Sequence, residues 1–322
     1  MINLAEELKG VQSVAIAGHI RPDGDSIGSC LGLYLYLKEN YPDLETDVYL
    51  EQTAAAYQSV YGIDEISHDF TRKKVYDLFF CLDCAPGARL GGAEVYQKSA
   101  KRTICIDHHI SNTGLSGSHY IVPEASSASE LVYRVLDKER IPFHAAEALY
   151  MGIVHDTGMF RHSCTGPETM EAAADLMRHG IPFTDIIDKT YSEKTYYQNQ
   201  ILGRALLESI LLMNGKIIFS AVRLKEMEFY NVGPSDLDGI VQALMLTAGT
   251  EAAIFLYETK PQEFKVSMRS KSVIDVSEIA GFFGGGGHVH AAGCTLQGSV
   301  YDVVNNITFH MERQLREAER TE

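Results

Sequence analysis

The sequence predicts an α/β protein with two domains. Three observations lead to this prediction. In the first half, short apolar runs alternate with helical patterns, which is typical of βαβ units and a parallel sheet with helices on both faces. After the turn signal Asn214-Gly215 the pattern of strands and helices changes. The length of 322 residues suits two domains better than one.

The expected domain boundaries follow these patterns. Tyr191–Leu212 has a long polar-to-apolar helical pattern that suits a connection between domains. We therefore expect a larger N-terminal domain over residues 1–190, a helical linker over residues 191–214 and a smaller α/β domain over residues 215–322.

The first half contains the strands of the predicted parallel sheet. Each candidate strand is a short β-rich run, and the segments between several of them have the longer period of a helix. The expected strands are Ser13–Ala17, Thr46–Leu50, Leu78–Leu82 and Thr103–Ile106, and the expected helices are Ser26–Glu39, Ala128–Lys138, His144–Val154 and Pro167–Arg178. His179-Gly180 and the proline of Ile181-Pro182 end the last of these helices.

The second half predicts a smaller mixture of strands and helices. A hairpin is expected around Lys260-Pro261, and four consecutive glycines follow a helix. The expected strands are Lys216–Val222, Ala252–Glu258, Glu263–Arg269 and Cys294–Leu296, and the expected helices are Ser235–Ala248, Asp275–Phe283 and Tyr301–Glu317.

The charge of the chain limits its partners. The formal net charge is −15, from 28 basic and 43 acidic residues. A protein that holds a long phosphate backbone usually carries a basic surface. We therefore expect no long duplex nucleic acid as a partner. Small phosphorylated substrates stay compatible with this charge, because local cations or metals can hold them.

The remaining composition suggests a cytoplasmic location and no membrane partner. No apolar run approaches the roughly 20 residues needed to span a bilayer, and the segment Met1–Glu7 lacks the features of a signal peptide. Cys81 and Cys84 form a C-x-x-C pair without a second pair, so we interpret them as structural thiols. A homodimer is compatible with these features.

Acidic and imidazole side chains follow the predicted strands. Gly18-His19 and the loop Asp23-Gly24-Asp25 come after the first strand, Asp83 after the third, and Asp107-His108-His109 after the fourth. His155-Asp156 closes an apolar helical stretch. Ligands of parallel sheets bind beyond the carboxyl ends of the strands. We therefore expect these four segments to form one site.

The composition of this site predicts two metal ions. Gly24 allows a sharp turn, so that Asp23 and Asp25 can each supply a ligand to a different metal. Asp83 can bridge, because a carboxylate has two oxygens. Asp156 and one imidazole of the His108-His109 pair complete a second set of ligands. Without cations, four clustered carboxylates would repel one another and shift one another's pKa values.

The ligand types also favour certain metals. Mixed carboxylate and imidazole ligands suit manganese, iron or cobalt better than a thiolate-type zinc site. Manganese is the first expectation, with magnesium or cobalt as alternatives. A pair of metals about 3.5–4 Å apart clamps a phosphoryl oxygen and generates hydroxide from water near neutral pH.

The four glycines of the second half are a candidate anion-binding loop. Gly284 to Gly287 let backbone amides approach an anion closely. Arg269 offers a planar fork that suits phosphate oxygens. Arg161, near His155-Asp156, is a further candidate for substrate contact.

The order and spacing of these motifs resemble the DHH phosphoesterase superfamily. The C-terminal half is similar to the associated DHHA1 domain, and the resemblance spans nearly the whole chain. It is greatest to the subgroup of bifunctional oligoribonucleases that also remove the 3′-phosphate from 3′-phosphoadenosine 5′-phosphate (pAp). The motifs are His19-x-x-x-Asp23-x-Asp25-x-x-Gly28-Ser29, Asp83, Asp107-His108-His109 and His155-Asp156-Thr157-Gly158, then Met268-Arg269-Ser270 and Gly284-Gly285-Gly286-Gly287-His288-x-x-Ala291-Ala292-Gly293.

The resemblance implies a role for each residue. His109 faces the scissile phosphate, and Asp107 orients an imidazole. Arg269 and the loop Gly284–His288 hold the terminal phosphate and base of the substrate in a cleft between the domains. The first metal is held by His19, Asp23 and Asp83, and the second by Asp25, Asp83, His108 and Asp156. The expected substrates are pAp and short single-stranded oligonucleotides of about two to five nucleotides.

The sequence is also compatible with other functions. The runner-up within enzymes is a cyclic or linear dinucleotide phosphodiesterase. The N-terminal motifs also resemble family II inorganic pyrophosphatases, although the motif Gly284–Gly293 argues against them. A nucleotide-binding regulator without turnover is the alternative of another class. Such regulators tend to lose ligands, whereas every expected ligand is present here.

Overall fold

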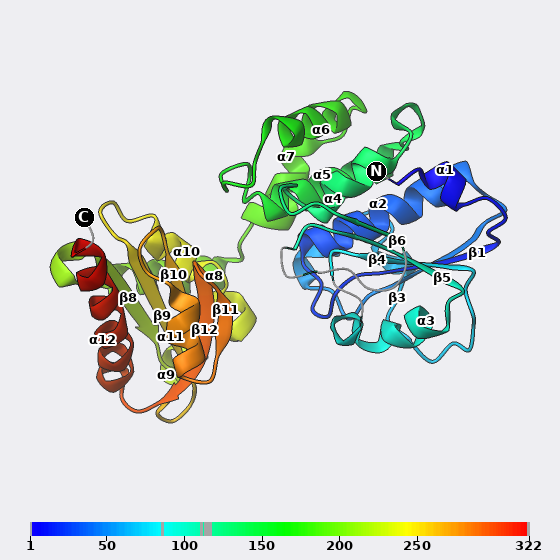
Figure 1. Cartoon of the computed structure of the whole chain (residues 1–322). Helices are drawn as coiled ribbons and strands as arrows, with labels where there is room; N and C mark the ends of the chain where they lie inside the picture. The colour runs from blue at the N-terminus through cyan, green and yellow to red at the C-terminus, as the bar shows by residue number, and fades with distance from the viewer. Residues whose placement is uncertain (1, 85–86, 110–111, 113–117, 321–322) are drawn as a thin grey trace. The chain divides into compact units, whose positions relative to one another are not determined.

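The chain folds into two compact units, residues Met1–Glu193 (unit 1) and Lys194–Glu322 (unit 2). The computed structural model describes residues 2–84, 87–109, 112 and 118–320 (Figure 1). Unit 1 contains a parallel sheet and unit 2 a mixed sheet, so the predicted fold class is confirmed.

The sheet of unit 1 has six strands, all parallel, in the order β3-β2-β1-β4-β5-β6. The chain winds outward from β1 in one direction and then from β4 in the other. The gap between β1 and β4 is therefore the switch point at which doubly wound sheets bind ligands. The strands are β1 (Ser13–Ala17), β2 (Glu45–Tyr49), β3 (Ile66–Ser67), β4 (Leu78–Leu82), β5 (Arg102–Asp107) and β6 (Ser118–Ile121).

Helices cover both faces of this sheet (Figure 1). Side chains of a strand alternate between the faces, and β1 follows this rule. Val14 and Ile16 pack against α2 and α5, whereas Ala15 and Ala17 lie in the core of the opposite face with Tyr96 of α3. The helices are α1 (Leu4–Glu7), α2 (Gly24–Asn40), α3 (Glu94–Ser99), α4 (Ala128–Val135), α5 (Phe143–Asp156), α6 (Pro167–Arg178) and α7 (Phe183–Ile187).

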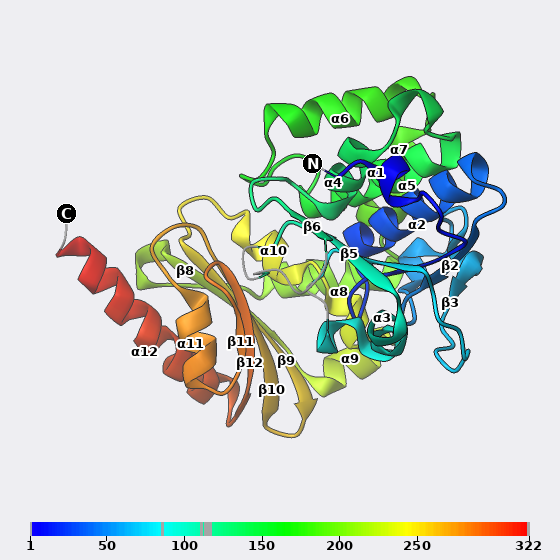
Figure 2. The same ribbon diagram turned by 45° about the vertical axis from the view of Figure 1, so that its right-hand side comes forward.

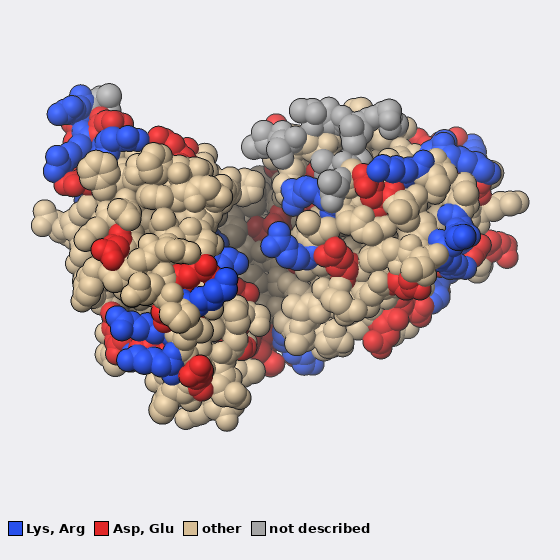
Figure 3. Space-filling view, turned by 90° about the horizontal axis from the view of Figure 1, so that it is seen from below, with Lys and Arg blue, Asp and Glu red and all other residues tan. Residues whose placement is uncertain are grey.

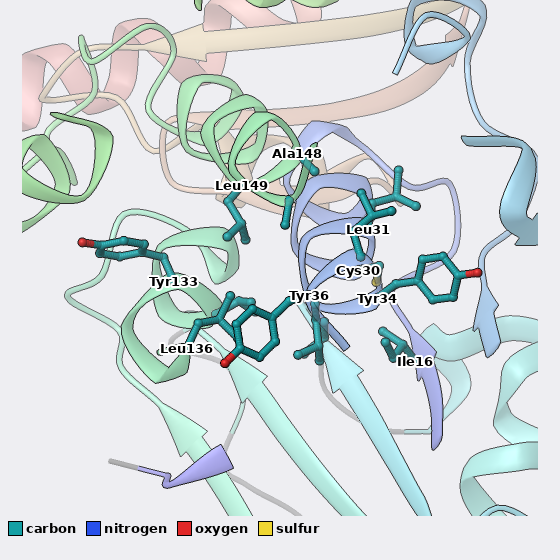
Figure 4. Close-up of a cluster of buried hydrophobic side chains, with 14 of the residues drawn as sticks. Ile16, Cys30, Leu31, Tyr34, Tyr36, Tyr133, Leu136, Ala148 and Leu149 are labelled. Carbon is teal, nitrogen blue, oxygen red and sulfur yellow. The ribbon is translucent and has the colours of Figure 1, made fainter. Parts of the chain in front are cut away.

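The close packing of α2 against α5 depends on glycines. A Cβ atom at Gly28 would lie 2.5 Å from the carbonyl oxygen of Ala148 and 2.9 Å from Cα of Gly152. The two backbones therefore approach as closely as they do only because Gly28 has no side chain. Figure 4 shows part of the surrounding core, with labelled side chains of α2, such as Cys30 and Leu31, and of α5, Ala148 and Leu149. This contact fixes α2 and α5, each of which places acidic residues at the candidate site.

Unit 2 is built on a six-stranded sheet in the order β11-β12-β10-β9-β8-β7, in which only the β8–β9 pair is parallel. Helices α11 and α12 cover one face and α8 and α10 the other (Figure 2). The strands are β7 (Ile210–Leu212), β8 (Ile217–Val222), β9 (Ala252–Lys260), β10 (Glu263–Ser270), β11 (Gly286–His288) and β12 (Ala291–Gln297). The helices are α8 (Tyr196–Leu207), α9 (Leu224–Tyr230), α10 (Ile240–Met245), α11 (Val276–Phe282) and α12 (Val300–Glu319).

The prediction of one long helix over Tyr191–Leu212 is wrong. The first two residues of this segment belong to a π-helix over Asp188–Ser192, and α8 is a separate helix that begins after Thr195. The Thr195 hydroxyl accepts from the amide of Gln198, and the Gln198 side chain accepts from the amide of Thr195, a capping box that starts a new helix. The last residues form β7 because they pair with β8. Most of segment 191–214 thus packs within unit 2, where Ile201 and Ala205 are buried.

Two other expected helices are shorter than their patterns. The segment Ser235–Ala248 contains a 3-10 turn over Pro234–Leu237 and then α10, separated by Gly239 at φ 89°. This left-handed conformation interrupts the helix. The helix expected over Ala128–Lys138 ends at Val135, because Leu136 adopts an extended conformation.

The surface of the described residues carries mixed charge. On the face shown in Figure 3, basic and acidic side chains are interspersed on both units and do not gather into one basic surface. Of the helices in the described part of the chain, none is long and apolar enough to cross a membrane.

Candidate metal centre

The candidate site lies at the carboxyl edge of the unit 1 sheet. His19 follows β1, Asp83 follows β4, and His108 follows β5, whose last residue is Asp107. Since β1 and β4 are neighbours in the sheet, His19 and Asp83 lie at its switch point. The local order of the sequence, a buried strand followed by a polar residue, is enough to place these side chains together.

The loop Asp23-Gly24-Asp25 is fixed from two sides. Asp23 caps α2, and its carboxylate accepts from the amides of Asp25 and Ser26, both at 3.1 Å. Asp25 is 1% exposed, and its two oxygens accept from the amides of Ala128 (2.7 Å) and Ser129 (2.9 Å). These amides belong to the first turn of α4, where the helix dipole favours a carboxylate. The two acidic side chains of one loop are therefore held by different helices.

His19, Asp23 and Asp83 form the first group of candidate ligands. One ligand atom from each of the three lies within 4.8 Å of the others. His19 Nε2 is 3.3 Å from Asp83 Oδ2 and 3.6 Å from Asp23 Oδ1. His19 Nδ1 donates to the carbonyl of Ile20 at 2.8 Å. This hydrogen bond fixes the tautomer in which Nε2 of a neutral ring presents its lone pair to the group.

Asp25, His108 and Asp156 form the second group, with one ligand atom of each within 4.8 Å of the others. His108 Nε2 is 3.1 Å from Asp156 Oδ2 and 3.5 Å from Asp83 Oδ1. The two oxygens of Asp83 thus face different groups, Oδ2 toward His19 and Oδ1 toward His108. A bridging carboxylate requires this arrangement.

Asp107 and His109 lie beside the two groups, and with Asp83 and His108 they form a third cluster in which one ligand atom of each lies within 4.8 Å of the others. The fully buried carboxylate of Asp107 accepts from Nδ1 of His109 at 2.7 Å and from the amides of His108 and His109. Its other oxygen accepts from Nδ2 of Asn112 at 2.6 Å. Asp107 therefore orients the ring of His109, holds the backbone of His108, and leaves Nε2 of His109 as the ring atom available to a ligand. Asn112 could not be identified from the sequence, because an asparagine in a loop has no local signal of burial.

The carboxylates and imidazoles of the cluster shift one another's protonation. Burial alone would lower the pKa of His19, but the hydrogen bonds to Asp23 and Asp83 outweigh it and raise the pKa to about 11. For His108, burial is likewise outweighed by Asp83, Asp25 and Asp156, and the pKa rises to about 10. Burial and the neighbouring carboxylates raise the pKa of Asp156 to about 7 and raise that of Asp25.

These pKa shifts show that the cluster needs positive charge to compensate its carboxylates. In the absence of other cations, protons on His19, His108 and Asp156 offset the negative charge of the carboxylates. Divalent cations would replace those protons and neutralise the same carboxylates. The donor set, carboxylate oxygens and imidazole nitrogens, is one that hard and intermediate divalent metals bind. The residues present therefore fit a pair of divalent metal ions.

We expect metal binding to release protons. His19 and His108 must lose theirs to become ligands, so at pH 7 titration with Mn²⁺ should release about two protons or more. Because these protons are held in the metal-free protein, the apparent affinity should rise with pH across the neutral range. Calorimetry in two buffers of different ionisation enthalpy measures the proton count. His19→Asn should lower it by about one; a count near zero in the unaltered protein would contradict the assignment.

The remaining candidate residues lie elsewhere. Arg161 Nε donates to the carbonyl of Gly158 at 3.0 Å, in the turn that follows α5. Arg269 lies on β10 in unit 2 and donates to the carbonyl of Met268 at 2.9 Å. The segment Gly285–His288 is exposed, and its last three residues form β11. Arg269 and the segment Gly285–His288 belong to unit 2, whereas Arg161 belongs to unit 1. None of them is among the clustered ligands of the described residues.

Cys81 and Cys84 flank Asp83 inside the protein. Both are fully buried, and their sulfur atoms are 3.3 Å apart. Burial raises the pKa of the Cys81 thiol well above its usual value. Neither thiol is part of the groups of clustered ligand atoms in the described residues.

The fold and this cluster define an α/β protein with a candidate two-metal centre at the switch point of a doubly wound sheet. Residues 13–153 match the model of the DHH family, N-terminal domain, and residues 214–317 match that of the DHHA1 domain. The chain belongs to the DHH family and contains both a DHH N-terminal domain and a DHHA1 domain.

Similar proteins extend over nearly the whole chain. It is 30% identical to a protein of Thermus thermophilus named bifunctional oligoribonuclease and PAP phosphatase NrnA, covering 92% of this chain and 88% of the relative. It is 26% identical to the Bacillus subtilis protein of the same name, covering 95% and 96%. Among solved structures, an exopolyphosphatase-related protein of Bacteroides fragilis is similar at 25% identity and a TM-score of 0.88, covering 96% and 94%.

Proposed function

We propose that this protein is a metal-dependent phosphoesterase that hydrolyses short oligonucleotides to 5′-mononucleotides and pAp to AMP and phosphate. The main support for this proposal is the position of Asp83, whose two oxygens face two separate groups of ligand atoms. The relatives from T. thermophilus and B. subtilis, which match over nearly their full lengths, are named for these two activities.

The proposed ligand sets follow the two groups. His19, Asp23 and Asp83 would hold one metal, and Asp25, His108 and Asp156 the other, with Asp83 added to the second set through its contact with His108. Manganese is the proposed ion, with magnesium or cobalt as alternatives, because the donors are oxygen and nitrogen. When bound, such ions supply Lewis acidity and neutralise negative charge on phosphate oxygens.

His109 is the proposed group that contacts the reacting phosphate. Its hydrogen bond to Asp107 raises the pKa of His109 above the usual value, so its ring carries a proton to a higher pH. Nδ1 donates to Asp107, and Nε2–H is then the donor available to a phosphoryl oxygen. A donor fixed in this way stabilises the charge that develops during displacement. Asp107 and Asn112 act through His109 and do not touch the substrate.

Three further features are proposed to hold the substrate. Arg269 has the planar fork that pairs with phosphate oxygens. The segment Gly285–His288 exposes backbone amides that can approach an anion. Arg161 lies in the turn after the α5 ligand Asp156 and is a further candidate cation. The net charge of −15 and the mixed surface support short substrates over long nucleic acids (Figure 3).

The test is substrate turnover by the full chain with added Mn²⁺. We expect release of mononucleotide from a labelled RNA dinucleotide and of phosphate from pAp, and loss of both with a chelator or with Asp156→Ala. Turnover of pyrophosphate alone would place the protein with pyrophosphatases. Turnover of a cyclic dinucleotide alone would favour that phosphodiesterase, and bound Mn²⁺ without any turnover would favour a nucleotide-binding regulator.

A further inference from the structure

His155 precedes Asp156 at the end of α5, and its ring packs on the loop that carries Asp23 and Asp25. A Cβ atom at Gly24 would lie 2.1 Å from Cγ and 2.4 Å from Nδ1 of His155. The imidazole is thus in contact with the backbone of Gly24. The sequence predicts no separate role for this histidine, because a single histidine beside an acidic residue has no distinctive local pattern.

The hydrogen bonds around His155 have a defined direction. The Thr190 hydroxyl donates its only proton to the carbonyl of Ile186 at 2.7 Å. Its oxygen therefore accepts from Nε2–H of His155 at 3.0 Å. With Nε2 protonated in the neutral ring, Nδ1 accepts from the hydroxyl of Tyr57 at a longer distance, 3.4 Å. Each donor in this chain has one acceptor.

The chain of hydrogen bonds joins segments that are distant in sequence. It runs from Tyr57 through His155 to Thr190, in the π-helix Asp188–Ser192. Short π-helical segments are frequent at functional sites. Tyr191 of the same π-helix contacts the His155 ring edge-on, with centroids 5.2 Å apart. The ring is therefore held between the loop and the last element of unit 1.

We propose that His155 is a positioning residue that fixes the Asp23 side of the Asp23-Gly24-Asp25 loop through its hydrogen bond to Thr190. The two amides of α4 hold Asp25 independently. Loss of the Thr190 contact should therefore loosen Asp23 and leave Asp25 in place. This inference rests on the proposed role of Asp23 as a metal ligand, but not on which substrate is hydrolysed.

Substitutions of Thr190 separate the hydrogen bond from packing. Thr190→Val keeps the shape and removes the hydroxyl, whereas Thr190→Ser keeps the hydroxyl. Thr184→Val, in exposed α7, is the matched control. In the full chain, Thr190→Val should weaken Mn²⁺ binding at one of two sites by about 3- to 10-fold, the range of one lost hydrogen bond. Amide exchange of residues 23–26 in the metal-free protein should quicken by a similar factor. Thr190→Ser and Thr184→Val should leave both values near those of the unaltered protein.

A double-mutant cycle identifies the ligand through which Thr190 acts. In an Asp23→Asn background, Thr190→Val should have little further effect on Mn²⁺ affinity, whereas in an Asp156→Asn background its full effect should persist. Equal effects in both backgrounds would overturn the proposal, as would a Thr190→Ser variant that behaves like Thr190→Val. Binding and exchange are measured without substrate. Failure of turnover with these responses intact would therefore refute only the proposed function.

Discussion

Replacement of Asp83 with asparagine is expected to lower kcat/KM for the dinucleotide by about 10³-fold or more. Asp83 is the one carboxylate whose oxygens face both groups of described ligand atoms. Loss of its charge weakens both metal positions at once, and metal ions contribute several kcal/mol of transition-state stabilisation. The measurements are steady-state kinetics and the number of Mn²⁺ ions bound per chain, which should fall below that of the unaltered protein.

The fold should tolerate this substitution. Asp83 has a positive φ of 56°, and asparagine is among the residues that most readily adopt this left-handed conformation. Asp43→Asn, an exposed site with the same change, is the matched control and should retain full activity. An Asp83→Asn variant that binds two Mn²⁺ ions and turns over at the unaltered rate would remove Asp83 from the ligand set.

Replacement of Glu130 with alanine is expected to destabilise unit 1 by about 3–5 kcal/mol. Glu130 is fully buried in the first turn of α4 and forms an ion pair with Arg134. It also accepts from the hydroxyls of Ser126 (2.5 Å) and Thr169 (2.9 Å). Alanine would remove all of these acceptors and leave a partly buried arginine unpaired. Urea denaturation followed by circular dichroism, with amide exchange across α4 and α6, measures the loss in the full chain.

Two further variants serve as comparisons for the stability of Glu130→Ala. Glu130→Gln should cost less, because its amide oxygen can still accept from Ser126 and Thr169. Glu171→Ala removes an exposed carboxylate from α6 and should leave stability almost unchanged. Equal stability of the Glu130→Ala and Glu171→Ala proteins would show that the buried contacts contribute little. Because the first turn of α4 also holds Asp25, Glu130→Ala should weaken Mn²⁺ binding as well.

Much of the fold followed from local patterns. The strands Ser13–Ala17 and Leu78–Leu82 and the helix Pro167–Arg178 have the predicted bounds. Each is either a buried apolar run or a periodic helix with a clear start or stop signal, and such signals lie within the segment itself. Elements without their own signal were missed. The two-residue strand β3 exists through pairing with β2, and β7 through pairing with β8.

The sequence by itself determined which residue types end the strands, and therefore which side chains are candidate ligands. That metals bind them stays a prediction, but the structure brings the six candidate ligands together in the two groups. For His19, Asp83 and His108 local order is enough, because the strands of a parallel sheet all end at one edge. Asp25 and Asp156 lie on α2 and α5, so their positions depend on the packing of these helices.

The tertiary structure alone decided how these side chains are held. Asp25 is fixed by amides more than 100 residues away, at Ala128 and Ser129. The separation of the two Asp83 oxygens and the contact between His155 and Thr190 likewise depend on segments distant in the chain. Hydrogen bonds between such segments leave no periodic trace in the sequence, since each needs only one donor and one acceptor brought together by packing.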